Sequence, residues 1–234
     1  MQSNQFLIID GPQGALIDPG GELVFSELSA AVAKEIPLDK LDYIIASHQD
    51  PDVIASLGSW VSQTDATVVC SRLWIRFLPH LLPRHLGDSL SERCLALADR
   101  GDELPLGRSV IKVVPAHFLH SVGNFQFYDP VSRILFSGDM GASILRSEVD
   151  RPIESWAEFR KHIPYMRPFH QRYMASNKVC RLWAEAVRKL DLEMVVPQHG
   201  RAFKGPEAIG DFLHWISHLA CGVDLATSEH YEIP

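Results

Sequence analysis

Apolar runs that stop at a histidine or an aspartate recur four times along this chain of 234 residues. The four junctions read "IIASHQDPD" (residues 44–52), "VVPAHFLHSVG" (113–123), "ILFSGDMG" (134–141) and "VVPQHG" (195–200). Short apolar runs bounded by turn residues are typical of buried strands. Loops at strand ends carry functional side chains on a rigid scaffold. We therefore expect four strands whose ends bring these side chains into one site.

The rest of the pattern predicts an α/β chain. Strands are expected at residues 6–10, 15–18, 41–47, 66–71, 109–114, 125–129, 132–138 and 193–199. Helices are expected at 22–36, 52–60, 71–86, 154–190 and 205–220, the fourth interrupted near Pro164 and Pro168. Strands followed by helices in both halves predict a sheet between helical layers. With no linker and no internal repeat, we expect one domain spanning residues 1–234.

The composition argues against several classes of protein. A formal net charge of -7, with no block of Lys and Arg, disfavours nucleic-acid binding. No run of about eighteen apolar residues occurs and the N-terminus has no basic leader, so we expect a cytoplasmic protein without a membrane span. The four cysteines lie far apart with no CxxC pair, which predicts reduced core thiols. Eleven histidines are more than packing needs, which makes a metal site the first hypothesis.

Side chains able to bind a metal stand at each junction. The candidates are His48, Asp50 and Asp52 from the first, either His117 or His120 from the second, Asp139 from the third and His199 from the fourth. Taken singly, a histidine after a strand is more often hydrogen-bonded or exposed, and an aspartate before Pro or Gly is more often a turn former. Four such coincidences at successive strand ends predict a metal site.

The chemistry of the candidates also limits the choice of metal. With His120 rather than His117, the set has three imidazoles and three carboxylates, too many for one four-coordinate ion. Such a set suits two ions that share a bridging carboxylate, and its mixed N/O character favours iron or manganese over zinc. Three negative charges against two divalent cations leave about one positive charge, which would stabilise bound hydroxide, superoxide or peroxide.

At these residues the sequence resembles the metallo-β-lactamase superfamily, and within it the diiron domain of flavodiiron proteins and the stand-alone oxygen-binding diiron proteins. Hydrolases of the superfamily usually show H-x-H-x-D-H, and flavodiiron domains show H-x-E-x-D. This chain has His48, Asp50 and Asp52, with a carboxylate in place of the second histidine. "FLHSVGNF", "LFSGDMG" and "PQHG" are similar to the remaining family segments. The resemblance covers nearly the whole chain and implies an αββα sandwich of two mixed sheets flanked by helices.

The resemblance also implies a ligand set and a cofactor. The first iron would take His48, Asp50 and His120, the second Asp52 and His199, and Asp139 would bridge them. Two iron ions (Fe2+/Fe3+) with a bridging oxo, hydroxo or O2-derived ligand are expected. Asp50 is one methylene shorter than the usual glutamate, so it ligates directly or through water. Val53 stands where many relatives have a further histidine, so the second iron is expected to be the more open one.

Two further residues of the resembling segments are expected near the site rather than in it. His117 is expected in the outer shell or at the surface, with ligation as the alternative. Tyr173, in "FHQRYMASNK", is expected to be a buried tyrosine with a satisfied hydroxyl, with contact to the bound gas as the alternative.

The implied function is that of a non-haem diiron protein that binds or reacts with O2. It would be an O2 sensor or carrier, or an O2/NO reductase that needs a separate electron donor, because the chain has no glycine-rich phosphate loop for a flavin. The alternative is a binuclear metallohydrolase acting on an ester, lactone or phosphodiester. An electron-donor or signalling protein and a homodimer are the expected partners. The apolar segment 71–86 is interpreted as a helix capping the sheet, with a dimer surface or a lid as the alternatives.

Overall fold

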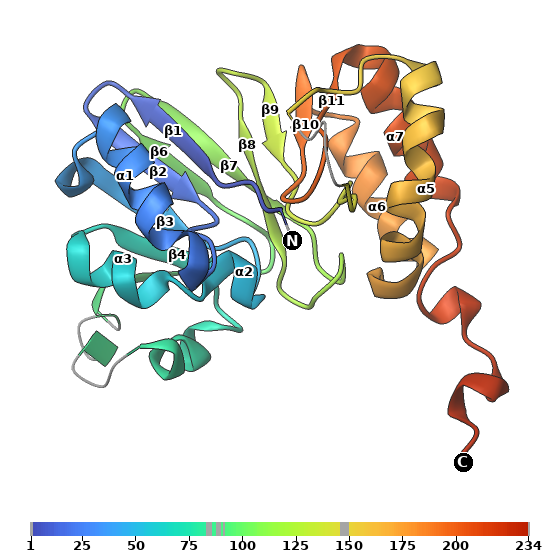
Figure 1. Ribbon diagram of the computed structural model, residues 1–234, viewed down its shortest axis with the longest axis horizontal. Coiled ribbons are helices and arrows are strands. Elements are labelled where there is room, and N and C mark those ends of the chain that lie inside the picture. Colours follow the sequence, from blue (N-terminus) through green and yellow to red (C-terminus); the bar gives the residue numbers. More distant parts are fainter. Residues whose placement is uncertain (1, 83–85, 88–89, 91, 146–149, 234) are drawn as a thin grey trace. The chain divides into compact units, whose positions relative to one another are not determined.

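The computed structural model describes residues 2–82, 86–87, 90, 92–145 and 150–233 (Figure 1). Contacts group the chain into two compact units. The N-terminal unit comprises Ser3–Pro115 and Gly123–Val131, and the C-terminal unit comprises Met1–Gln2, Ala116–Val122 and Ser132–Pro234. Within the described ranges, no helix combines the length and the apolar character needed to cross a membrane.

A five-stranded sheet forms the centre of the N-terminal unit, in the order β1-β2-β3-β4-β5. Its strands are β1 (Phe6–Asp10), β2 (Gln13–Ile17), β3 (Leu41–Ile45), β4 (Thr67–Ser71) and β5 (Cys94–Leu97). β1 runs antiparallel to β2, and the other neighbours are parallel. The central strands β3 and β4 are mostly buried, which explains why they are nearly continuous apolar runs in the sequence.

Helices cover one face of this sheet (Figure 1). They are α1 (Phe25–Glu35), α2 (Pro51–Ile54) and α3 (Leu57–Gln63). Val32 of α1 and Leu57 and Trp60 of α3 join Ile44 and Val68 of the strands in one buried cluster. Each such side chain stabilises the fold by roughly 1.5–3 kcal/mol when fully buried. The unit is completed by three antiparallel strands, β6 (Glu103–Leu106), β7 (Ser109–Pro115) and β8 (Phe125–Asp129).

The C-terminal unit packs three helices with three short strands. β10 (Met194–Val196) runs parallel to β9 (Ile134–Phe136) and antiparallel to β11 (Phe203–Lys204). The helices are α5 (Trp156–Tyr173), α6 (Asn177–Val187) and α7 (Gly205–His218). The ring of Phe212 stacks on Phe203 at 4.3 Å and meets Trp183 edge-on at 6.0 Å, so it ties α7 to both β11 and α6.

The predicted interruption of the long helical region is at the wrong place. α5 continues through Pro164 and Pro168, and the break comes after Tyr173. Both prolines are exposed and lie four residues apart, so the carbonyls that lose their donors fall on the solvent side of the helix. The opposite face is buried at intervals of three and four residues, which holds the helix to the unit.

The helix predicted at 52–60 is two helices. The amide of Ser56 donates to the carbonyl of Gly20 (3.1 Å) instead of to a carbonyl of its own helix, and its hydroxyl contacts the carbonyls of Pro19 and Gly20 at 2.8 Å. The segment at 71–86 is also shorter than predicted, because a 3-10 helix spans Ile75–Leu81 with Pro79 inside it. Pro83 lies outside the described residues. The strands β5, β6 and β11 were not predicted.

Candidate metal centre

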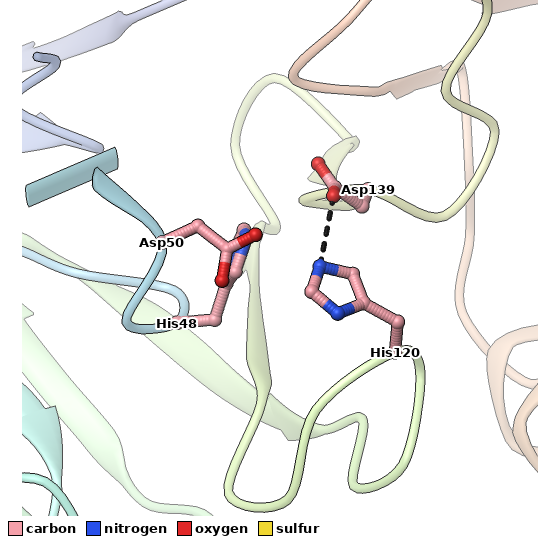
Figure 2. A group of neighbouring side chains, drawn as sticks. All are labelled: His48, Asp50, His120 and Asp139. Atoms are coloured by element: carbon pink, nitrogen blue, oxygen red, sulfur yellow. Dashed lines mark ion pairs between the residues drawn. The ribbon is translucent and has the colours of Figure 1, made fainter. Parts of the chain in front are cut away.

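In the C-terminal unit, Asp139 faces two of the predicted histidines. Its Oδ2 lies 3.0 Å from Nε2 of His120, and its Oδ1 lies 3.6 Å from Nε2 of His199. Figure 2 shows the first of these pairs, with the imidazole of His120 pointing at the carboxylate. Asp139 and His199 are buried, and the His120 side chain is 12% exposed. Each carboxylate oxygen therefore faces a different imidazole.

The turn that carries Asp139 depends on glycine. Gly138 (φ 53) and Gly141 (φ 97) have left-handed backbone conformations. A Cβ on Gly141 would lie 2.8 Å from the Phe203 ring. The turn directly follows β9, which explains the "SGDMG" sequence.

A buried histidine of α5 holds the same turn. Nε2 of His170 accepts the amide N–H of Gly141 at 3.0 Å, and its Nδ1–H donates to the carbonyl of Met166 at 2.8 Å. Burial lowers the pKa of His170 to about 4, so the ring is neutral and keeps Nε2 as an acceptor at pH 7.

His199 is oriented by the start of the chain. It follows β10, and its Nδ1 donates to the carbonyl oxygen of Gln2 at 2.6 Å, while the side chain of Gln2 accepts the amide of Gly200 at 2.9 Å. With the proton on Nδ1, a neutral ring presents the lone pair of Nε2 on the side of Asp139. Such a hydrogen bond on the second ring nitrogen is the usual support of a metal-binding histidine.

Aromatic rings border His120. Its imidazole meets Phe169 and Tyr173 edge-on, at 6.1 and 5.8 Å between centroids, and these two rings stack on each other at 4.8 Å. Tyr173 is 56% exposed, so the expectation of a buried tyrosine is wrong. It is the last residue of α5, and the next residue, Met174, has an extended backbone.

In the N-terminal unit, His48 and Asp50 stand together in the loop between β3 and α2 (Figure 2). His48 is buried, and its Nε2 lies 3.8 Å from Oδ2 of Asp50, whose side chain is 35% exposed. Nδ1 of His48 lies 2.9 Å from the hydroxyl of Ser47, and that hydroxyl donates to Asp18 at 3.1 Å. Because Asp18 takes the hydroxyl proton, Ser47 accepts from Nδ1–H and leaves Nε2 as the lone-pair nitrogen.

The neighbouring residues of this loop have different environments. Asp52 is half-buried in the first turn of α2, and Val53 is fully buried in the apolar cluster of the N-terminal unit. A side chain at position 53 thus points into the core, which is a structural reason for valine there. His117 is half-buried. The roles of Asp52 and His117 stay predictions.

The supporting residues were not predicted from the sequence. They are Gln2, Asp18, Ser47 and His170. Each contacts a residue far away in the sequence. Gln2 lies 197 residues from His199, Asp18 lies 29 residues from Ser47, and His170 lies 29 residues from Gly141. The one sequence signal was the position of Asp18, which directly follows β2 as the predicted ligands follow their strands.

Comparison with known proteins relates the chain to diiron proteins. A family model described as ODP family beta lactamase matches residues 1–200. A solved structure of a peroxy diiron species of the chemotaxis sensor ODP is 41% identical, with a TM-score of 0.86 over 99% of this chain and 92% of that chain. The apo state of the chemotaxis sensor ODP from T. denticola is 42% identical, with a TM-score of 0.85 over 97% and 90%. These matches confirm the expected α/β, β-lactamase-like fold.

More distant relatives are longer proteins. The flavodiiron protein from Giardia intestinalis shares the fold, with a TM-score of 0.74 and 21% identity over 93% of this chain and 51% of that chain. The chain spans about half or less of the curated relatives it matches: 49% of a Methanocaldococcus jannaschii protein (29% identical, 86% of this chain) and 35% of a Synechocystis protein named as a diflavin flavoprotein (32% identical, 91% of this chain).

Proposed function

The chain belongs to the ODP family of β-lactamase-like proteins, and we propose that it holds two iron ions and binds or reacts with O2. The proposal rests first on Asp139, whose two oxygens face the Nε2 atoms of His120 and His199 separately. A carboxylate that served one ion would need only one oxygen or would chelate with both. Oxygens directed at two different imidazoles suit a carboxylate that bridges two ions.

The donor set fits iron. We propose that His48, Asp50, Asp52, His120, Asp139 and His199 converge on the two ions. Imidazole and carboxylate donors together favour iron or manganese over zinc, whose structural sites are richer in sulfur. The hydrogen bonds from His48 to Ser47 and from His199 to Gln2 leave Nε2 of each ring able to ligate, which supports a metal role over a structural one.

The division of ligands follows the resemblance. His48, Asp50 and His120 would hold one iron, Asp52 and His199 the other, and Asp139 would bridge them. When bound, the iron pair would supply electrons for a reaction with O2. The residues of this chain orient the donors and limit access to them: Ser47 and Asp18 fix His48, Gln2 fixes His199, and the rings of Phe169 and Tyr173 flank His120.

The relatives support O2 as the ligand. The ODP structures are described as a chemotaxis sensor, one of them as a peroxy diiron species. We propose that this chain is likewise a sensor or carrier of O2, working with a signalling partner, and that any turnover of O2 or NO draws electrons from a separate donor protein. A homodimer is proposed as its assembly.

The test is metal analysis and spectroscopy of anaerobically purified protein. We expect about two irons per chain and a new visible absorption band when the reduced protein meets O2. Asp139→Asn should lose iron and the band, because an amide cannot bridge two cations. Asp65→Asn, which changes an exposed aspartate of the N-terminal unit, should retain both.

Other outcomes would contradict the proposal. A colourless protein that retains only zinc with or without air would refute the diiron assignment. If that protein also hydrolysed a generic phosphodiester, and Asp52→Ala abolished the hydrolysis, the binuclear metallohydrolase would replace it.

A further inference from the structure

Two of the four cysteines lie against each other in the C-terminal unit. Sγ of Cys180, the fourth residue of α6, is 3.9 Å from Sγ of Cys221, which follows α7. Both residues are fully buried, and both are free thiols. The distance is that of a weak thiol–thiol hydrogen bond. It exceeds a disulfide bond length of about 2.05 Å by roughly 1.9 Å.

The two segments that carry these thiols are clamped by backbone contacts. Ser176 and Gly222, near the two cysteines, form an antiparallel β-bridge. The amide of Gly222 donates to the carbonyl of Gln171, and the amide of Val223 donates to that of Ala175, both at 2.9 Å. The position of Cys221 relative to the start of α6 is therefore set by the main chain.

Side chains strengthen the clamp in both directions. Oδ2 of Asp224 accepts the amide N–H groups of Asn177 (2.6 Å) and Cys221 (3.2 Å). The amide side chain of Asn177 donates in return to the carbonyls of Ser217 and Leu219, at 3.0 and 2.9 Å, near the end of α7. Asp224 thus satisfies a terminal amide of α6, and Asn177 satisfies carbonyls at the end of α7.

Gly222 makes this close approach feasible. Its φ is +53°, and a Cβ there would lie 2.2 Å from the carbonyl oxygen of Met174 and 2.3 Å from that of Ala175. Only glycine fits without displacing the backbone. The residue beside Cys221 is therefore one that lets the chain reach the thiol on α6.

We propose that Cys180 and Cys221 form a reversible disulfide, with hydrogen peroxide as the oxidant. The Cys221 thiolate attacks one peroxide oxygen, the O–O bond breaks, and Cys221 becomes a sulfenic acid while hydroxide leaves. The Cys180 sulfur then attacks the Cys221 sulfur, the S–O bond breaks, and the Cys180 proton leaves with the hydroxyl group as water. In total two thiols lose two electrons and two protons, and one peroxide becomes two waters.

The proposal assigns the first attack to Cys221. The hydrogen bond from the Cys180 thiol lowers the pKa of Cys221, while burial and the Asp224 carboxylate act against this shift. The same pairing raises the pKa of Cys180. A hollow of about 680 Å³ is lined by Gly222 and Val223 among others, the two residues that follow Cys221 in the chain, so peroxide can approach the backbone next to this thiol.

The disulfide would act on the neighbourhood of a predicted metal ligand. It would join α6 covalently to the segment that leads to the final residues of the chain. The short turn between α5 and α6 is hydrogen-bonded to the loop that carries His120, because the amide of Ala175 donates to the carbonyl of Phe118 at 3.2 Å. Oxidation of the pair would thus restrict the movement of the turn to which the His120 loop is hydrogen-bonded.

The test is a thiol map of the full chain after peroxide treatment, in the presence of a chelator that keeps iron from forming radicals. Remaining thiols are alkylated, and the protein is digested without reduction for mass spectrometry. We expect a Cys180–Cys221 cross-linked peptide, two hydrogens lighter than the sum of its parts, that disappears on treatment with dithiothreitol. Cys70 and Cys94 serve as internal controls: burial raises the pKa of Cys70 to about 12 and that of Cys94 to about 11, so few thiolates are present to react with peroxide. Both should stay reduced and be alkylated once the protein is unfolded in denaturant.

One variant tests the order of the two steps, and a second serves as its control. Cys180→Ser should stop at a Cys221 sulfenic acid that a dimedone probe traps, and Cys70→Ser should form the cross-link as the wild type does. Wild-type protein that keeps all four cysteines alkylated after peroxide would overturn the proposal. So would wild-type protein in which Cys221 proceeds to sulfinic acid without a cross-link.

Discussion

The buried histidine behind the Asp139 turn makes a quantitative prediction about acid stability. Burial lowers the pKa of His170 from 6.5 to about 4 in the folded chain. Between these two values the unfolded chain binds a proton that the folded chain does not, so the free energy of unfolding falls as the pH falls from 6.5 toward 4. The stabilisation is fully present above pH 6.5.

The size of the effect follows from the shift. A difference of about 2.5 pKa units corresponds to about 3 kcal/mol when fully expressed. Between pH 7 and pH 5, linkage with these two values removes about 2 kcal/mol of stability. Mesophilic domains have only about 5–15 kcal/mol in total, so the loss is measurable.

His170→Gln tests this reasoning. Glutamine offers one acceptor for the Gly141 amide and one donor for the Met166 carbonyl, but it does not titrate. We expect the loss of unfolding free energy between pH 7 and pH 5, measured by urea denaturation of chelator-treated protein, to be about 2 kcal/mol smaller than in the wild type. Met166→Ala, which removes a buried apolar side chain from the same helix, should lower stability equally at both pH values.

Identical pH dependence in the wild type and His170→Gln would refute the assignment of a neutral, buried imidazole. His162 provides an independent check, because burial lowers its pKa to about 4 as well. His162→Gln should therefore reduce the acid sensitivity in the same direction, and the double variant should reduce it further.

Three further changes test other parts of the structure. Ser47→Ala should weaken iron binding roughly 10–100-fold in a competition titration with a chelator, because it removes the acceptor that orients His48; exposed Ser62→Ala should not. Gly222→Ala should lower the free energy of unfolding by at least about 1–2 kcal/mol in urea, since its φ is +53° and its Cβ would meet two carbonyl oxygens; full stability would show that the bridge is not formed. Trp60→Phe should cost about 0.5–1.5 kcal/mol by thermal denaturation because the carbonyl of Pro19 loses one of its two buried donors, the Ser56 hydroxyl being the other, and an unchanged melting temperature would contradict that.

The sequence predicted most of the strands because they are short apolar runs bounded by turn residues. The expected strands at 6–10, 41–47, 66–71, 109–114 and 125–129 correspond to β1, β3, β4, β7 and β8. These runs are apolar and bounded by turn residues. The three-residue strands β9 and β10 were also predicted, because their apolar runs lead into the junctions at Asp139 and His199. β5, β6 and β11 end at no such junction and were missed.

Helix boundaries were harder to predict because they depend on partners elsewhere in the chain. Pro164 and Pro168 usually end helices, but both face solvent here and the buried side of α5 outweighs the two lost hydrogen bonds. At Ser56 the reverse occurs. The residue has no helix-breaking side chain, and the helix stops because its amide bonds to Gly20, 36 residues earlier.

The same distinction explains which parts of the candidate site were predictable. Asp139 and His199 each lie three residues after the end of an apolar strand, so local sequence identifies them. The groups that orient them do not follow a local rule: His199 is held by a main-chain carbonyl 197 residues away, which any residue at position 2 would supply. Side-chain identity carries no signal for such a contact.

The support of the Asp139 turn has a consequence for how the protein responds to acid. His170 accepts the Gly141 amide only while it is neutral, since the imidazolium has no acceptor nitrogen. Protonation would leave that amide without its acceptor, two residues from the carboxylate whose oxygens face His120 and His199. The folded imidazole takes up a proton only as the pH approaches 4, so this contribution to loss of the proposed metal should begin near that pH, below the range in which stability starts to fall. In His170→Gln the turn keeps its acceptor at every pH, so metal release near pH 4 should be smaller than in the wild type. If release in the variant followed the wild-type curve, ligand protonation alone would govern it and the turn would have no part.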